Sequence, residues 1–356
     1  MKILITGVGG PTPRSFVNAL RLYGNYTDYE FYATDINPLA IGLYQKDIYK
    51  KAFIVPPASH KNYWTAIETI IKENGIEYAV ILPELEVLEW SRRQAQDTLP
   101  CKVLLPDHTL VKQLIDKAKM TAVLEDLGVV PASVEFQREE KELDSISTKL
   151  GVPYWVRSTS GSSGLGSLLI NNREELENWV RINPNVDRFL ASTYLPGRNL
   201  GCKMLYYKGK LLRTAVGERV NYIMAKVAPS GITGNTSFGR LLNEPEVVQT
   251  AIKAMDRLFE FTGTQKHGFF TVDFKEDANG KPYITEVNVR HVAFTQCFAA
   301  GGANLAEDTI RLMREDQTFD LNYRMYEFEK GLIFLRDVDE RPIIMKEADL
   351  LKRSPK

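Results

Sequence analysis

The sequence predicts an α/β protein that begins with an open, Rossmann-like domain and continues into strand-rich and mixed regions. Strand-like and helix-like segments alternate over residues 1–110, which is typical of a parallel sheet covered by helices. The composition then changes, first to helices and from residue 151 to strands. A chain of 356 residues also exceeds one ordinary hydrophobic core, so two or three domains are expected.

The first domain is predicted from short apolar runs separated by turns. Residues 2–6 form a buried strand, and the glycines that follow it turn the chain into a helix that ends near Gly24. A second strand ends on Asp35. The predicted elements are strands 2–6, 31–34, 78–82 and 103–105, and helices 14–23, 63–73 and 86–96.

The remaining elements follow from the same signals. One or two helices over residues 110–127 are closed by Gly128 and Pro131. Residues 228–243, rich in Gly, Ser, Thr and Asn, are predicted to be a long loop. The other predicted elements are strands 152–157, 167–170, 188–194 and 331–335, hairpins 206–214 and 268–291, and helices 174–182, 245–262 and 305–314.

Charge and composition exclude several classes of protein. Lys+Arg and Asp+Glu both number 45, so there is no basic excess of the kind that nucleic-acid or membrane-surface proteins carry. No apolar run approaches the ~20 residues needed to cross a bilayer, and no signal peptide is expected. The three cysteines and four histidines lie far apart, without disulfide or metal-ligand spacing. We therefore expect a reduced, cytoplasmic protein.

The glycine turn after the first strand allows two interpretations. Gly7, Gly9 and Gly10, with Asp35 after the second strand, resemble a dinucleotide-binding turn with its ribose-binding acid. However, Thr12 stands where the third glycine would be, and two nearby prolines remove backbone donors. We favour a tight structural turn without a nucleotide. Glu84 and Glu86, after a later strand, either face a substrate cleft or, as we favour, mark the start of a helix.

A second candidate site is the loop of glycines and serines over residues 158–167. It lies between two strands and lacks the Gly-Lys-Ser/Thr of a Walker loop. Its backbone amides and hydroxyls are suited to solvating phosphate oxygens, and Arg157 directly before it supplies positive charge. An exposed linker with no ligand is the equally weighted alternative.

The third candidate site is the predicted hairpin 268–291. Because side chains alternate along strands, Glu286, Asn288 and Arg290 share one face. If residues 277–282 form the turn, Asp273 lies opposite Glu286 on that face. Two facing carboxylates raise each other's pKa unless a cation lies between them, and with an amide oxygen they suit Mg²⁺. We favour a metal site over a solvated polar face.

Taken in order, these motifs resemble the ATP-grasp superfamily, and most closely the relatives of the carbamoyl-phosphate synthase large chain and of biotin carboxylase. The resemblance covers residues 1–315. It rests on Asp116-Lys117 and the segment Gly-Val-Val-Pro that ends at Pro131, on 151–157 with the Gly/Ser loop, on 189–197, and on the hairpin. It implies an ATP-grasp fold with a Rossmann-like N-terminal domain (1–110), linker helices and a small β-rich lid (111–194), a C-terminal α+β lobe (195–320) and a terminal strand and tail (321–356).

The resemblance also implies roles for residues. Arg290 and Arg157 are the expected catalytic side chains, and Mg²⁺ is expected on Asp273, Glu286 and Asn288, where Mn²⁺ would fit too. The residues expected to bind ATP are Lys117, Arg157, Ser162, Ser163, Gly164, Ser192, Tyr194, Leu195 and Lys226. Ser192 and Asn199 stand where the family usually has glutamates, so ribose recognition would differ here.

The implied function is an ATP-dependent ligase that joins a carboxylate to an amine, such as an amino acid or peptide, through an acyl phosphate. Small-molecule carboxylates and amines are the expected partners, without nucleic acid or membrane, and a homodimer is compatible with this picture. The alternatives are a carboxylating or carbamate-phosphorylating enzyme and a catalytically silent ATP-binding subunit. A nicotinamide-dependent dehydrogenase built on the glycine turn is the weakest reading.

Overall fold

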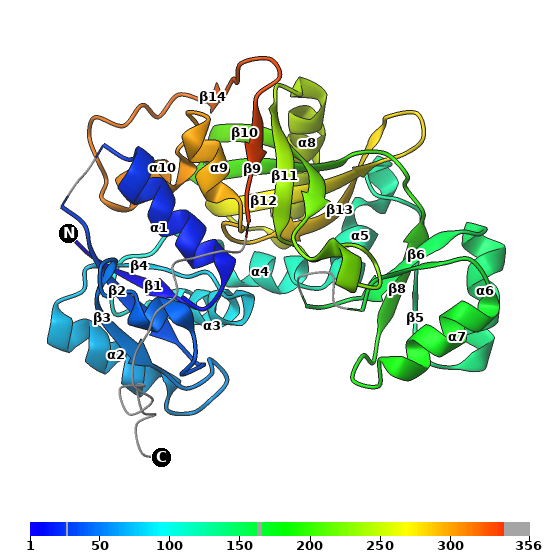
Figure 1. The fold of residues 1–356 in the computed structure, drawn as a ribbon, viewed down its shortest axis with the longest axis horizontal. Helices are drawn as coiled ribbons and strands as arrows, with labels where there is room; N and C mark the ends of the chain where they lie inside the picture. Colours follow the sequence, from blue (N-terminus) through cyan, green and yellow to red (C-terminus); the bar gives the residue numbers. More distant parts are fainter. Residues whose placement is uncertain (26–27, 162–165, 338–356) are drawn as a thin grey trace.

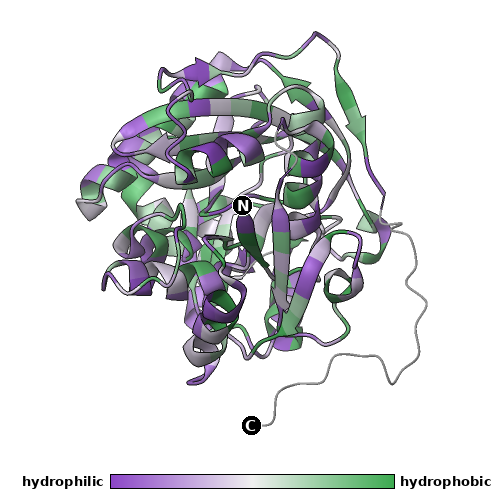
Figure 2. Cartoon of the chain, turned by 90° about the vertical axis from the view of Figure 1, so that its left-hand side faces the viewer, coloured by the Kyte–Doolittle hydropathy of each residue, from purple (hydrophilic) through white to green (hydrophobic). Residues whose placement is uncertain are grey.

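The computed structural model describes residues 1–25, 28–161 and 166–337, which contain three β-sheets (Figure 1). We use the names N-terminal domain, lid and C-terminal lobe for these sheets and the helices packed on them. The N-terminal domain has a four-stranded parallel sheet in the order β3-β2-β1-β4. β1 leaves the marked N-terminus and is hydrophobic along most of its length (Figure 2). Its elements are β1 (Lys2–Thr6), α1 (Pro11–Tyr23), β2 (Glu30–Asp35), η1 (Ile41–Tyr44), β3 (Tyr49–Ile54), α2 (Tyr63–Asn74), β4 (Tyr78–Val80) and α3 (Glu84–Gln94).

Two features of this domain differ from the prediction. β3 was not predicted, because its paired lysines are exposed at the sheet edge and hide the apolar pattern. Residues 103–105 were predicted to be a strand, which is wrong: only Lys102 bridges to Tyr78. Leu104 and Leu105 are instead buried as loop residues directly before Pro106, which has no backbone donor to continue a ladder.

The lid is a four-stranded antiparallel sheet with two helices and a small core of its own. The strand order is β5-β8-β6-β7, and side chains such as Phe136, Ile146, Tyr154 and Phe189 fill the space under α6 and α7. Two linker helices and a short turn precede it. The elements are α4 (His108–Leu114), α5 (Lys117–Leu124), η2 (Glu125–Leu127), β5 (Ser133–Phe136), α6 (Glu140–Leu150), β6 (Tyr154–Ser158), β7 (Leu168–Ile170), α7 (Arg173–Ile182) and β8 (Phe189–Thr193).

The C-terminal lobe is built on a seven-stranded sheet in the order β13-β12-β9-β10-β11-β15, with β14 paired to β10. One apolar core joins α8 and this sheet to the N-terminal domain, since Leu4, Trp90, Phe270 and Leu258 belong to one cluster. The elements are β9 (Asn199–Tyr207), β10 (Lys210–Tyr222), η3 (Ala225–Val227), β11 (Thr236–Leu242), α8 (Pro245–Thr262), β12 (Gly268–Glu276), β13 (Pro282–Asn288), α9 (Thr295–Ala300), α10 (Leu305–Met313), β14 (Arg324–Met325) and β15 (Ile333–Leu335).

The predicted loop 228–243 is only half a loop. Its second half is β11, which pairs with β10 on one side and β15 on the other. Gly239 lets Phe334 pack on this strand, because a Cβ there would lie 2.3 Å from the phenylalanine ring. Small and polar residues concealed the strand, whose register is set by its two neighbours. Within the described residues, no helix is long and apolar enough to cross a membrane.

Candidate active site

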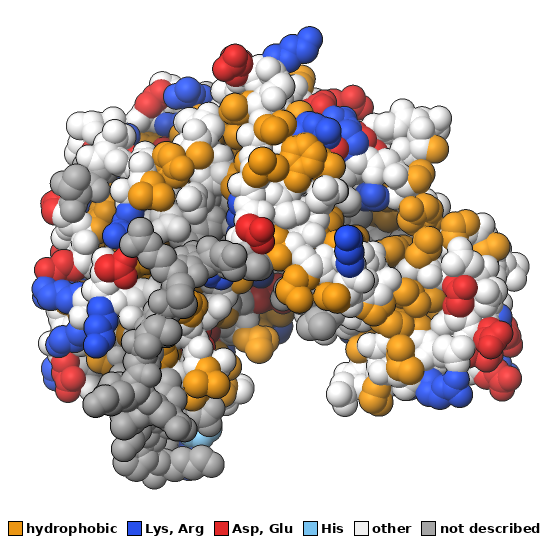
Figure 3. All heavy atoms as spheres, viewed as in Figure 1, with side chains coloured by type: hydrophobic (Ala, Val, Ile, Leu, Met, Phe, Trp, Pro, Cys, Tyr) orange, Lys and Arg blue, Asp and Glu red, His pale blue; other side chains and the backbone are white. Residues whose placement is uncertain are grey.

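A cleft of about 1160 Å³ lies where the three parts of the molecule meet. The space-filling view shows the molecule hollowed between the N-terminal domain and the lid (Figure 3). Strand ends of the N-terminal sheet, the Gly/Ser loop, the β8–β9 connection and the β12–β13 hairpin all contribute to its lining. Side chains far apart in the sequence therefore face one shared space.

The β12–β13 hairpin places its polar side chains as the alternation predicted. Asp273 pairs directly with Glu286 across the two strands, so the expected register is confirmed. The Asn288 amide donates a hydrogen bond of 3.1 Å to Asp273. All three side chains line the cleft.

Arg219, on β10, holds the Asp273 carboxylate in a buried ion pair that the sequence analysis missed. Both side chains are largely buried, at 12% and 15% exposed. Burial raises the pKa of Asp273, and the guanidinium of Arg219 opposes that rise. Lys203 lies behind the pair, only 1% exposed, with its ammonium 4.2 Å from the centre of the Phe294 ring. Burial lowers the pKa of Lys203 well below its usual value.

The donor set of this hairpin fits a magnesium ion. Two carboxylates and one amide oxygen are hard oxygen ligands, and Mg²⁺ takes few such protein ligands when phosphates and waters complete its shell. No group of three or more His, Cys, Asp and Glu side chains suited to a metal occurs among the described residues. Asp273, Glu286 and Asn288, of which only two are of these types, are the residues that would hold the ion, and the ion would neutralise phosphate charge.

Lys117 and Arg157 connect the lid side of the cleft to this hairpin. Lys117 begins α5, whose N-cap Asp116 accepts from Ala118 and Lys119. The Lys117 ammonium donates a hydrogen bond of 2.7 Å to the Gly161 carbonyl and lies 3.9 Å from a Glu286 oxygen. Arg157 donates a hydrogen bond of 2.7 Å to the Thr285 carbonyl, and burial lowers the pKa of Arg157. Both cations therefore lie beside the carboxylates.

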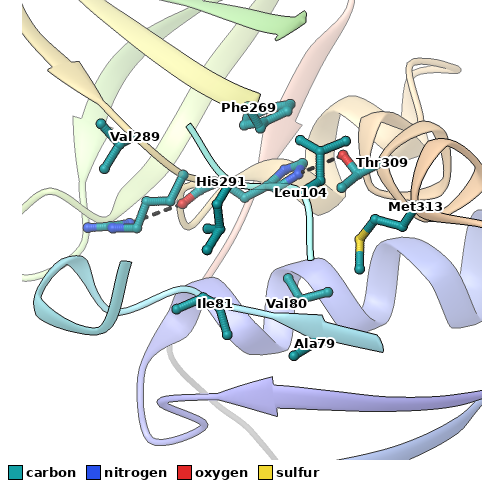
Figure 4. A pocket seen from close by; sticks show the side chains of 11 residues that line it. Ala79, Val80, Ile81, Leu104, Phe269, Val289, His291, Thr309 and Met313 are labelled. Atoms are coloured by element: carbon teal, nitrogen blue, oxygen red, sulfur yellow. Dashed lines mark hydrogen bonds between the residues drawn. The ribbon is translucent and has the colours of Figure 1, made fainter. Parts of the chain in front are cut away.

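Arg290 enters the cleft from the residues that follow β13. Its guanidinium donates a hydrogen bond of 3.0 Å to the carbonyl of His291. The His291 ring stacks on the Phe269 ring, with 3.5 Å between the two centroids. The His291 ring is also hydrogen-bonded to the Thr309 hydroxyl at 3.1 Å, and both side chains line a small cavity of about 20 Å³ beside β4 (Figure 4). This buried support fixes the backbone from which Arg290 reaches into the cleft.

Three arginines around the cleft bury a guanidinium N–H that has no hydrogen-bond partner in the structure. In each case the atom is Nε, and the residues are Arg157, Arg219 and Arg290. Buried donors without an acceptor are rare in folded proteins, so these N–H groups are available to an oxygen-bearing ligand. Together with Lys117 and Lys275, these arginines give the lid and lobe walls of the cleft five basic side chains.

The connection from β8 to β9 lines a less polar part of the cleft. Ser192, Tyr194 and Leu195 all belong to the lining, together with Trp155 and Phe274. Ser192 is 4% exposed, and its hydroxyl lies 2.8 Å from that of Ser133. Asn199, at the start of β9, is in register with both Lys275 and Arg219.

Some predicted site residues do not join this cluster. Lys226 is exposed on η3 and is absent from the lining of the cleft. Ser162, Ser163 and Gly164 lie outside the described residues. Ser158, Ser160 and Gly161 of the same loop do line the cleft.

The N-terminal glycine turn has a structural explanation. The Asp35 carboxylate accepts from the Gly9 amide at 2.7 Å and from the Asn37 amide at 2.8 Å. The carboxylate that would bind a ribose is thus engaged by backbone donors, in agreement with the favoured reading of a structural turn. The turn and Asp35 nevertheless line the cleft, as do Glu84 and Glu86 in the first turn of α3.

We expect Glu86 to make the stability of the folded protein depend on pH. It is 6% exposed, and burial raises its pKa to about 7 from 4.5. Because the folded state binds this proton more tightly than the unfolded chain, stability is lost as the pH rises from about 4.5 to above 7. We expect Glu86→Gln to remove roughly 3 kcal/mol of this pH dependence in urea denaturation. An unchanged pH dependence in the variant would contradict the assignment.

Comparison with known proteins places the fold. No protein-family profile and no curated protein matches the chain. The L-amino acid ligase of Bacillus licheniformis superposes with a TM-score of 0.61 at 16% identity, over 88% of this chain and 74% of that one. The N5-carboxyaminoimidazole synthetase of Staphylococcus aureus, complexed with ADP, gives 0.68 at 15% identity, over 92% and 79%.

A third similar structure is the biotin carboxylase domain of the Hydrogenobacter thermophilus 2-oxoglutarate carboxylase, in complex with MgADP, ADP and bicarbonate. It has a TM-score of 0.66 at 16% identity, over 90% of this chain and 71% of that one. Identities this low show the fold alone, and the three proteins differ in what they join. The chain has the fold of these ligases and this carboxylase domain, so the predicted ATP-grasp fold is confirmed.

Proposed function

We propose that this chain is an ATP-dependent ligase that joins a carboxylate to an amine. The observation that supports it most is the convergence of Asp273, Glu286 and Asn288 with four cations, Lys117, Arg157, Arg219 and Arg290, around one cleft in an ATP-grasp fold. Phosphoryl transfer depends on charge neutralisation and alignment more than on a protein acid or base, and this arrangement supplies both.

The residues that line the cleft offer separate surfaces for the base and for the phosphates of ATP. Trp155, Leu195 and Phe274 contribute apolar surface to the lining of the cleft, which suits a flat base, and Tyr194 lies next to Leu195 in the same lining. Mg²⁺ held by Asp273, Glu286 and Asn288 would neutralise phosphate oxygens. Lys117 and Arg157 would offset the charge that develops on the transferred phosphoryl group, and Arg290 would orient the acyl group.

The reaction then has two steps. An oxygen of the substrate carboxylate attacks the γ-phosphorus of ATP, the bond to ADP breaks, and an acyl phosphate forms. The nitrogen of the amine attacks the acyl carbon, the C–O bond breaks, phosphate leaves with the electron pair, and the nitrogen releases a proton. Lys117 holds the Gly/Ser loop through Gly161, which helps to exclude water that would hydrolyse the acyl phosphate.

Nucleotide binding is tested by thermal unfolding with and without MgATP. A ligand at about 100 times its Kd adds about 2.7 kcal/mol, so Tm should rise by about 2 °C or more. We expect the rise to require Mg²⁺, since Asp273 and Glu286 would otherwise face the phosphates directly. No rise at saturating nucleotide would overturn the assignment of the ATP site.

Ligase activity is tested by ADP release with pools of carboxylates, using hydroxylamine to trap an acyl phosphate as a hydroxamate. The proposal expects a hydroxamate from at least one carboxylate and faster ADP release when amines are added. ADP release that depends on bicarbonate would support a carboxylating enzyme instead. ATP binding without turnover on any pool would support a silent binding subunit.

A further inference from the structure

The two sides of the cleft carry opposite charge. The lid and lobe sides contribute five basic side chains and two acids, Asp273 and Glu286. Among the described residues, the N-terminal side contributes Asp35, Glu84 and Glu86 and no lysine, arginine or histidine. We call this side the acidic wall. Phosphates fit the first side, whereas a cation fits the acidic wall.

The acidic wall is built by three strand ends of one parallel sheet. β1 leads to the glycine turn, β2 ends on Asp35, and β4 leads to Glu84. Ligands of open α/β sheets bind at this carboxyl edge. A Cβ on Gly7 would lie 2.4 Å from the Pro83 ring, so glycine allows the turn to pack against the residue that precedes Glu84.

The carboxylates of the wall differ in what they already contact. Both oxygens of Asp35 accept backbone hydrogen bonds. Glu84 makes no hydrogen bond or ion pair with another described residue. It does interact electrostatically with the charges of Glu286, Arg290 and Lys117. Glu86, although 94% buried, has an oxygen with no hydrogen-bond partner. The buried free oxygen of Glu86 calls for a donor, and the partly exposed carboxylate of Glu84 is open to a ligand.

The same wall is poorly suited to a phosphate group. α1 begins at the cleft, and the N-terminus of a helix ordinarily binds anions through its free amides. Here Pro11 and Pro13 remove two of the first three amide donors. The acids nearby would also repel a phosphate. A phosphorylated acceptor substrate is therefore disfavoured on this side.

Resting on the proposed ligase function, we propose that the acidic wall binds the amine substrate as its ammonium form, and that this amine carries no phosphate. Before the nitrogen attacks the acyl phosphate, the ammonium gives one proton to the Glu84 carboxylate, which frees the nitrogen lone pair. Glu84 is the residue of the acidic wall that contacts the ammonium, because it interacts with the charges of Glu286 and Arg290, where the acyl phosphate would form. Burial and the charge of Glu286 raise the pKa of Glu84, which an incoming ammonium would reverse. Bicarbonate, an anion, has no cationic partner on this wall.

The test compares wild type, Glu84→Gln and the exposed surface variant Glu73→Gln. ADP release is measured with the carboxylate that yields the most hydroxamate, and with glycinamide, L-alaninamide or O-phosphoethanolamine as the amine. Wild type and Glu73→Gln should use the two amides in preference to the phosphorylated amine. Glu84→Gln should raise KM for the amides about tenfold or more, because a charged hydrogen bond is lost. Its hydroxamate yield should change by a much smaller factor.

The outcomes separate the two proposals. If wild type yields no hydroxamate from any carboxylate, the ligase function fails, and the amine site fails with it. If wild type yields hydroxamate but Glu84→Gln leaves KM for the amides unchanged, only the amine site is overturned. Equal losses of hydroxamate and amide turnover, or a preference for O-phosphoethanolamine or bicarbonate, would also overturn it.

Discussion

Glu286→Ala should abolish ADP formation while leaving the protein folded. Glu286 faces Asp273 across the hairpin and lies 3.9 Å from the Lys117 ammonium. Of the residues that the structure describes, it is one of two carboxylates on its side of the cleft. Removing it deletes a ligand to the proposed magnesium ion, whose contribution to catalysis is several kcal/mol. We therefore expect a rate lower by about a thousandfold or more.

The measurement is ADP release under saturating MgATP, beside the melting temperature without ligand. Glu329→Ala makes the same chemical change at an exposed position away from the cleft and should behave like wild type. Glu286→Ala should also lose most of the MgATP-dependent rise in Tm. Normal turnover in Glu286→Ala would contradict the assignment of Glu286 as a metal ligand.

Arg219→Met should be the most destabilising substitution in the site. Arg219 and Asp273 form a buried pair, and removing one partner leaves the other charge buried without compensation. Such changes cost about 3–5 kcal/mol of stability. The matched change Arg257→Met breaks an exposed pair with Asp126 and should cost about 1 kcal/mol or less.

The pH dependence identifies the cause. Without Arg219, the buried Asp273 carboxyl would have a pKa raised further above its ordinary value of 3.8. The folded state then holds a proton that the unfolded state releases, so the variant should lose stability as the pH rises above about 4. Adding Asp273→Asn should restore much of the stability at neutral pH. Urea denaturation at several pH values measures this, and equal costs for Arg219→Met and Arg257→Met would show that the pair is unimportant.

The sequence by itself determined what depends on local periodicity. Alternation along two strands and a turn between them were enough to place Asp273 opposite Glu286 with Asn288 on the same face. Helix α8 was predicted with its observed bounds, because a proline start, an apolar stripe and Gly263 mark it unambiguously. These signals act over a few residues, within one element or one hairpin.

Only the tertiary structure decided which distant elements meet. β10 and β12 lie on either side of the same strand, β9, and this brings Arg219 within reach of Asp273. No local pattern in the sequence encodes this strand order. Glu84 faces the same centre because the N-terminal domain docks through a shared apolar core. Lys226 was predicted to face the nucleotide from its place in the sequence, yet it lies exposed on η3. Side-chain periodicity fixes a face, whereas strand order and domain docking decide what that face meets.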